Sequence, residues 1–176
     1  NLTLVGGRLE HTTGRGSTNR SGLAVAGGTR QSNEFLFAGA DYKLTKQLTL
    51  QYYAAQLEDY YVQHFGGLVH VLPLGEGQSL TTDLRYFKTD ADGRNDSASG
   101  RDAGYRVGGL GDTPGKIDND TWSAMFTYAL GGNTFLLGYQ SVSDSGNFVQ
   151  LNQGNTNEGA AGSRLVTTVA STIVQA

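Results

Sequence analysis

Residues 47–88, QLTLQYYAAQLEDYYVQHFGGLVHVLPLGEGQSLTTDLRYFK, decide the fold class. Their first and last parts alternate apolar and polar side chains with a period of two, which is typical of β-strands with one apolar face. Glu58-Asp59 and Gly75-Glu76-Gly77 are the two places where the chain can reverse. The stretch therefore predicts three successive strands, 47–58, 61–74 and 78–88, joined by tight turns.

The same alternation recurs along the rest of the chain. It predicts further strands over 2–10, 34–42 and 120–130, a returning strand after the turn at 131–133, and a weaker final strand over 164–175. About eight strands result. The uncharged faces consist of Leu36, Ala38, Ala40 and Tyr42; Leu48, Leu50, Tyr52 and Ala54; Trp122, Ala124, Phe126, Tyr128 and Leu130; and Phe135, Leu137 and Tyr139.

The strand over 61–74 is the one whose two faces the pattern does not separate. His64, Gly66 and His70 share the parity of Leu68 and Leu72. Its water-facing side is left open at this point.

The connections differ in length at the two ends of the predicted sheet. The connections at one end, 43–46, 75–77 and 131–133, are all short. At the other end the connections 11–33, 89–116 and 143–163 are long, and only the reversal at 58–60 is short. An antiparallel meander with short turns at one end and long loops at the other is the outline of an outer-membrane barrel. We therefore predict an all-β fold, a transmembrane barrel with short periplasmic turns and long extracellular loops.

Composition is compatible with this prediction and excludes several functions. The chain has 26 glycines against 2 prolines and no cysteine, which suits strands and turns and excludes thiolate chemistry. A net charge of −3 does not show the excess of basic residues that is typical of nucleic-acid-binding proteins. The mean hydropathy of −0.34 fits a soluble protein, but it also fits a barrel in which only alternate residues face lipid.

Two alternatives remain open from the pattern alone. The first is a soluble ligand-binding barrel, with the apolar faces turned inward. The second is a structural envelope barrel or adhesin, in which loops 11–33 and 89–116 are the functional part. For the transmembrane barrel we expect residues 1–176 to form one barrel domain that is incomplete at both ends; the alternative is that these strands close into a narrow barrel of their own.

Two long segments resemble a known family. They are residues 38–96, AGADYKLTKQLTLQYYAAQLEDYYVQHFGGLVHVLPLGEGQSLTTDLRYFKTDADGRND, and residues 119–154, NDTWSAMFTYALGGNTFLLGYQSVSDSGNFVQLNQG. With QHFxGLVHxLPLG, DLRYF and GRDAGY, they are similar to the OprD-type substrate-specific porins of pseudomonad outer membranes. The resemblance is closest to the branch that takes up aromatic and other cyclic carboxylates.

The resemblance implies a monomeric outer-membrane barrel of about eighteen strands, narrowed by inward-folded loops. It implies passive uptake of small carboxylates along a track of basic side chains, with lipid and lipopolysaccharide around the barrel. No enzymatic activity, cofactor or metal is implied. This chain offers about eight of those strands, so much of the family's basic track cannot be assigned to it.

Five residues are candidates for the pore lining. Arg85 and Asp83 share the polar face of one strand, where a guanidinium can bind a carboxylate through two hydrogen bonds. The alternative is a structural ion pair between them. Arg8 is a candidate for a second basic residue of the pore lining, or it lies at the rim. Lys88 can steer anions at the mouth or be an ordinary exposed lysine. Arg101 lies in a long loop that either folds inward or stays solvated. His64 and His70 lack a third ligand, so we predict no metal site.

Overall fold

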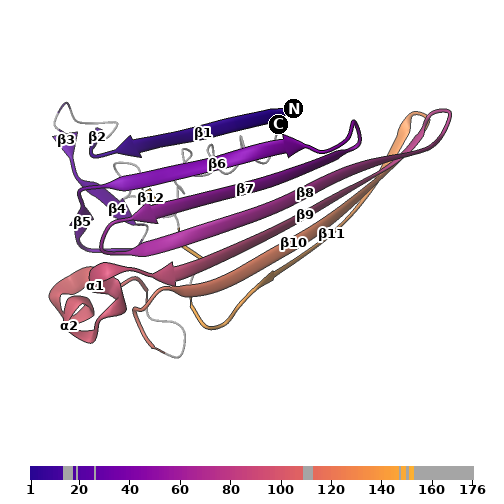
Figure 1. Cartoon of the computed structure of the whole chain (residues 1–176). Helices are drawn as coiled ribbons and strands as arrows, with labels where there is room; N and C mark the ends of the chain where they lie inside the picture. Colours follow the sequence, from indigo (N-terminus) through magenta and orange to yellow (C-terminus); the bar gives the residue numbers. More distant parts are fainter. Residues whose placement is uncertain are drawn as a thin grey trace.

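The computed structural model describes residues 1–13, 18, 20–25, 27–108, 113–146, 148–149 and 151–152. Its main element is a curved seven-stranded sheet with the order β1-β6-β7-β8-β9-β10-β11 (Figure 1). Every neighbouring pair is antiparallel. The strands are β1 Leu2–Leu9, β6 Phe35–Lys43, β7 Leu48–Leu57, β8 Tyr61–Gly75, β9 Gln78–Ala91, β10 Asp118–Leu130 and β11 Asn133–Val142. The predicted antiparallel meander is confirmed.

Two strands are longer than the alternation predicted. β9 continues past Lys88 to Ala91, and β10 begins at Asp118 instead of Asp120. The added residues are mostly polar, so they do not carry the apolar pattern on which the prediction rested. The predicted final strand over 164–175 lies outside the described residues.

Short connections gather at one end of the sheet, which we call the turn end. They are residues 44–47, 76–77 and 131–132. Gly77 and Gly131 have φ angles of +69° and +58°, in the left-handed region that glycine adopts without steric cost. The Gly131 amide donates to the Gly77 carbonyl oxygen at 2.8 Å, so the two hairpins, side by side in Figure 1, are bonded to each other.

The opposite end, which we call the loop end, carries the long connections, and these are more ordered than the sequence predicted. Between β1 and β6 lie the short strands β2 Thr12–Thr13, β3 Arg20–Ser21, β4 Leu23–Val25 and β5 Gln31–Ser32. The connection from β9 to β10 contains α1 Gly93–Asp96, α2 Ala98–Gly100 and a π-helical turn, Arg101–Tyr105. After β11, the strand β12 Leu151–Asn152 pairs with β4.

The register divides the sheet into two faces. One row across all seven strands, at the level of Leu84, is Leu2, Tyr42, Leu50, Leu68, Leu84, Ala124 and Tyr139. We call this side the apolar face. The adjacent row is Thr3, Asp41, Gln51, Gly67, Arg85, Ser123 and Gln140, on what we call the polar face. The uncharged faces predicted from the sequence all lie on the apolar face.

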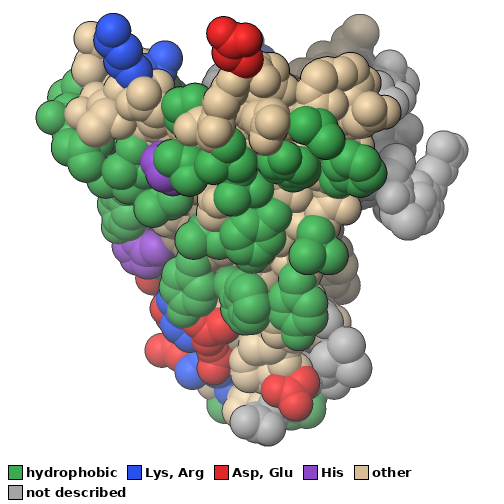
Figure 2. Space-filling view, turned by 90° about the vertical axis from the view of Figure 1, so that its right-hand side faces the viewer, with side chains coloured by type: hydrophobic (Ala, Val, Ile, Leu, Met, Phe, Trp, Pro, Cys, Tyr) green, Lys and Arg blue, Asp and Glu red, His purple; other side chains and the backbone are tan. Residues whose placement is uncertain are grey.

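The apolar face is exposed, although its side chains are large. Leu84 is 40% and Leu137 is 72% exposed, and Figure 2 shows hydrophobic side chains gathered in a broad area with charged side chains near its border. A patch of this extent is costly in water. Trp122 lies on this face toward the loop end, and Tyr128 and Phe135 lie toward the turn end, as interfacial aromatic residues do in membrane barrels.

The structure also assigns the two faces of β8. His64, Gly66 and His70 lie on the apolar face, because they pair with Ala54, Tyr52 and Leu48. The His64 Nδ1 atom and the Tyr52 hydroxyl are hydrogen-bonded at 2.8 Å.

Among the described residues, no helix is long and apolar enough to cross a membrane.

The loops pack on the polar face at the loop end. Phe35, Leu57 and Tyr61 of the sheet are buried there. Their partners come from the connections and are Leu23, Val25, Tyr60, Val107, Ile117 and Val149. Burial of this cluster, between the connecting segments and only one side of the sheet, holds the loops over that side.

A charge placed on the apolar face tests this division. We expect Leu84→Arg to lower the free energy of unfolding from lipid vesicles by about 2–4 kcal/mol, because a lipid-facing arginine must be desolvated. Thr81→Arg, three residues earlier on the polar face, is the matched control and should cost much less. Urea titration in vesicles measures both, and equal losses would contradict the assignment of faces.

Candidate functional site

Arg85 and Asp83 lie in the middle of β9 on the polar face. The Arg85 Nε atom donates to Asp83 Oδ1 at 2.8 Å, and Arg85 Nη2 donates to Asp83 Oδ2 at 2.5 Å. The side chains are 19% and 22% exposed. The structure therefore contains the ion pair that the sequence offered as an alternative, and the guanidinium is already arranged for two-point recognition of a carboxylate.

Further polar groups continue from this pair across the sheet. Gly67 faces Arg85 in the register, and Gln51 faces Gly67 from the other side. The Gln51 amide nitrogen donates to Asp41 Oδ1 at 3.0 Å. The row thus presents acid, amide and guanidinium groups side by side, which can exchange hydrogen bonds with a polar solute.

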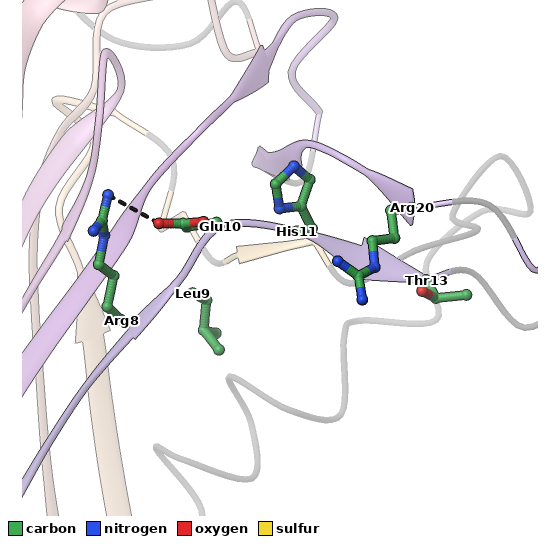
Figure 3. Close-up of a pocket in the computed structure, with 6 residues that line it drawn as sticks. All are labelled: Arg8, Leu9, Glu10, His11, Thr13 and Arg20. Carbon is green, nitrogen blue, oxygen red and sulfur yellow. Dashed lines mark ion pairs between the residues drawn. The ribbon is translucent and has the colours of Figure 1, made fainter.

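The register places Arg8 away from this row. Arg8 pairs with Leu36 on the apolar face, at its loop end. Its guanidinium lies 2.5 Å from Glu34 Oε2 and 3.0 Å from Glu10 Oε1. Figure 3 shows the surface pocket at this corner, lined by Arg8, Leu9, Glu10, His11, Thr13 and Arg20. The prediction of Arg8 as a second basic residue of the pore lining beside Arg85 is therefore corrected, since the two lie on opposite faces.

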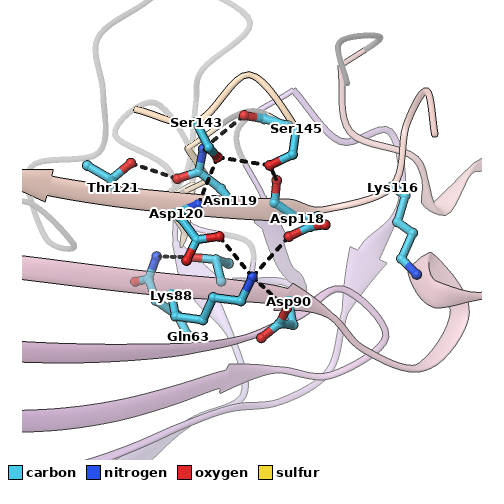
Figure 4. Close-up of polar contacts among 12 residues, drawn as sticks. Gln63, Lys88, Asp90, Lys116, Asp118, Asn119, Asp120, Thr121, Ser143 and Ser145 are labelled. Atoms are coloured by element: carbon cyan, nitrogen blue, oxygen red, sulfur yellow. Dashed lines mark hydrogen bonds and ion pairs between the residues drawn. The ribbon is translucent and has the colours of Figure 1, made fainter. Parts of the chain in front are cut away.

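Lys88 is also on the side of the apolar face, where that face meets the loops. Its ammonium group lies 3.2 Å from Asp90 Oδ1, 3.1 Å from Asp118 Oδ1 and 3.1 Å from Asp120 Oδ2 (Figure 4). Lys88 is thus held by three carboxylates outside the polar row. The sequence contained the signal, because the period-two spacing of Asp118 and Asp120 mirrors that of Lys88 and Asp90 on the neighbouring strand.

Arg101 holds together the connection between β9 and β10. Its Nη1 atom donates to the carbonyl oxygens of Asn95, at 2.6 Å, and Asp96, at 2.8 Å. Next to it, the Lys116 ammonium lies 2.7 Å from Asp96 Oδ1, and this hydrogen bond lowers the pKa of the Asp96 carboxyl group. Arg101 therefore has a structural role in this loop.

Asn95 is the residue on which the same loop is built, and its role was not predicted from the sequence. The side chain is fully buried. Its Nδ2 atom donates to the carbonyl oxygens of Tyr105, at 2.6 Å, and Gly115, at 2.9 Å, while Oδ1 accepts from the Ile117 amide at 2.8 Å. One side chain thus joins three points of the connection.

The reversal at 58–60 connects two loops to the sheet. The buried Tyr60 hydroxyl donates to the Arg30 carbonyl oxygen at 2.6 Å, and burial raises the pKa of Tyr60 to about 12. The Asp92 amide donates to the Tyr60 carbonyl oxygen at 3.0 Å, and the Asn95 amide donates to that of Asp59 at 3.0 Å. A short turn therefore fixes the loops from both neighbouring connections above the polar face.

Within the described residues, no group of three or more His, Cys, Asp or Glu side chains could hold a metal ion. The chemistry of the site lies in hydrogen bonding and charge.

A wall with this division of faces is stable when lipid covers one side and water the other. β1 and β11, the outer strands of the described sheet, each pair on one side only. In lipid such edges require further strands, because unpaired backbone groups there cost several kcal/mol each. These features define the class as a transmembrane β-barrel of the porin type.

Comparison with known proteins identifies the family. A family model described as "outer membrane porin, OprD family" matches residues 1–168. The curated relative Porin D of Pseudomonas aeruginosa is 31% identical over 137 residues, which are 78% of this chain and 27% of that protein. The chain belongs to the OprD family of outer membrane porins, as the resemblance predicted. It spans less than a third of the length of that relative.

Solved structures agree with this assignment. The crystal structure of Pseudomonas aeruginosa OccK8 (OprE) matches with a TM-score of 0.82 and 44% identity, over 92% of this chain and 42% of that one. Pseudomonas aeruginosa OpdK, solved with vanillate, matches with a TM-score of 0.70 and 26% identity, over 89% and 37% of the two chains. The turn end is accordingly periplasmic and the loop end extracellular.

Removing the Asn95 amide tests the construction of the loop. We expect Asn95→Ala to weaken the 92–117 connection by about 3 kcal/mol, because buried carbonyl and amide groups lose their partner. Limited proteolysis of the folded protein should then cut this connection at a lower protease concentration. Asp102→Ala, an exposed residue of the same connection, should leave the cleavage rate unchanged. Equal rates for both variants and the parent would refute the role of Asn95.

Proposed function

We propose that this chain forms part of the wall of a channel for passive, substrate-selective uptake of small carboxylates, aromatic or cyclic ones in particular. The observation that carries the proposal is the Arg85–Asp83 pair at the middle of the polar face. A guanidinium held there replaces part of the water that a carboxylate loses on entering a narrow lumen.

Asp83 gives this site the weak affinity that transport requires. An entering carboxylate competes with Asp83 for the same two N–H groups of Arg85, since both groups accept hydrogen bonds in the same geometry. When the solute moves on, Asp83 takes its place again. The exchange keeps the Arg85 guanidinium hydrogen-bonded throughout, so its positive charge is not left without a partner when the solute arrives or departs.

The surroundings of the pair support a lumen position. The apolar face meets lipid and the acyl chains of lipopolysaccharide, and the polar face meets water. The loop that carries Arg101 lies over the same polar face. Its guanidinium donates to two backbone carbonyl groups near the extracellular mouth, and in this proposal its positive charge favours the entry of anions.

The comparisons support the solute class. The neighbouring OpdK structure was solved with vanillate, an aromatic carboxylate. In our proposal each barrel is a separate channel, which acts as a monomer and needs neither a cofactor nor an energy source.

Reversing the charge of Arg85 tests the proposal. We expect Arg85→Glu to lower benzoate flux into liposomes about tenfold and to move the reversal potential toward cation selectivity, because a charged hydrogen bond of about 1.5–3 kcal/mol is replaced by repulsion. Arg85→Lys keeps the charge but loses the two-point geometry and should give an intermediate flux. Folding is checked by heat-modifiable migration, and unchanged flux and reversal potential in folded Arg85→Glu would refute the proposal.

A further inference from the structure

Aromatic side chains of the polar face lie directly over glycines. The Tyr53 ring on β7 occupies the space that a β-carbon of Gly39, its register partner on β6, would take. On β1, a β-carbon at Gly7 would lie 2.7 Å from Cζ of Phe37, its register partner. Contacts this short do not occur between a β-carbon and a ring, so each ring can lie where it does only because its neighbour is glycine.

We call a glycine that makes room in this way for an aromatic ring a seat. Gly67 is a third seat, and it faces Arg85 of the Arg85–Asp83 pair in the register. A β-carbon at Gly67 would lie 2.9 Å from Phe65 Cζ and 2.9 Å from Gln51 Oε1. Phe65 precedes Gly67 by two residues on β8, so its ring leans along the strand over the glycine. The Gln51 amide reaches the same seat from the adjacent strand.

The effect of the seats is that bulky rings lie along the wall. Tyr53 is 8% and Phe65 is 5% exposed, although both lie on the polar face in the transmembrane part of the sheet. Their rings are 6.1 Å apart, and the Phe87 ring follows at 4.7 Å from that of Phe65. Neighbouring rings are tilted by 45° and 42° to each other, so they form a continuous packed row along the polar face.

Other glycines of the sheet show that this arrangement is specific. Gly66 lies next to Gly67 but on the apolar face, and no atom lies within 4 Å of the position of its β-carbon. Gly138 on β11 would meet only ordinary contacts, at 3.8 and 3.9 Å. Close seating is found where an aromatic side chain of the polar face has to be accommodated.

We propose that Gly39 and Gly67 are specificity-determining positions, which set the aperture of the lumen by seating the Tyr53 and Phe65 rings against the wall. This inference rests on the proposed function, because it requires that the polar face lines a conducting lumen. A side chain at either position displaces a ring from its glycine, away from the backbone of the sheet and toward the polar side of the wall. At Gly67 the displaced groups are the Phe65 ring and the Gln51 amide, and they enter the lumen at the level of Arg85.

A narrowing at the level of Arg85 acts on solutes according to their size. A small inorganic anion still passes beside the displaced ring. A cyclic carboxylate has to bring its ring past the same point while its carboxylate exchanges with Asp83, so it is hindered more. The glycines therefore select among carboxylates by size, and Arg85 selects for the carboxylate group itself.

Gly67 is the better position for a test. At Gly39 a β-carbon would also lie 2.7 Å from the Tyr52 carbonyl oxygen, so the backbone of the wall would have to shift. At Gly67 the short contacts are to the ends of flexible side chains, which can move while the sheet is kept.

The experiment compares Gly67→Ala with Gly66→Ala in planar bilayers and liposomes. We expect Gly67→Ala to lower single-channel conductance about 1.5-fold and benzoate flux by a larger factor than chloride flux, because pore radius limits large solutes most. Gly66→Ala should match the parent in both. Adding Phe65→Ala to Gly67→Ala removes the displaced ring and should restore conductance and benzoate flux.

Phe65→Trp gives the same test without a substitution at the glycine, since a larger ring exceeds the seat and should also lower benzoate flux. Unchanged conductance and flux ratio in a folded Gly67→Ala or Phe65→Trp barrel would overturn the inference while leaving the proposed function intact. A folded parent that passes neither ion nor benzoate would refute the proposed function, and the inference with it.

Discussion

The structure depends on one constraint, which is that strands inside a membrane must satisfy their backbone hydrogen bonds with one another. Pairing in a fixed register follows, and it places alternate residues on opposite sides of the wall. Leu84 and Arg85 are neighbours in sequence, yet one faces lipid and the other water. A slip of one residue would exchange them, so the turns with left-handed Gly77 and Gly131 contribute to function by fixing the register.

The second layer of organisation joins the loops to the polar face. Tyr60 bonds to the connection before β6, and Asn95 holds together the connection before β10. Both are buried at the loop end, where Tyr60 is itself part of the apolar cluster. The loops thus cover the sheet on the side of the Arg85–Asp83 pair, while the apolar face of the described sheet stays exposed.

Much of this arrangement could be predicted from the sequence, because two-residue periodicity determines strands and faces together. The predicted turns, apolar faces and family are confirmed. The prediction of Arg8 as a second pore-lining residue beside Arg85 is wrong, because its parity matches that of Leu4 on the apolar face. Lys88 has the parity of Leu84 and lies at the loop end of β9, and its role at the mouth stays a prediction. The faces of β8 needed the register, since His64 and His70 interrupt its pattern. Asn95 could not be found, because its role depends on three backbone groups that meet only after folding.

The central claim is that the polar face lines a water-filled lumen and the apolar face meets lipid. The absence of native cysteine makes single-cysteine labelling the most direct measurement. Ser123 and Ala124 are consecutive on β10, opposite Arg85 and Leu84 respectively. In lipid vesicles, we expect a charged, membrane-impermeant thiol reagent to modify Ser123→Cys and to leave Ala124→Cys unreacted. Modification of Ala124→Cys with protection of Ser123→Cys would contradict the orientation of the wall and the channel inferred from it.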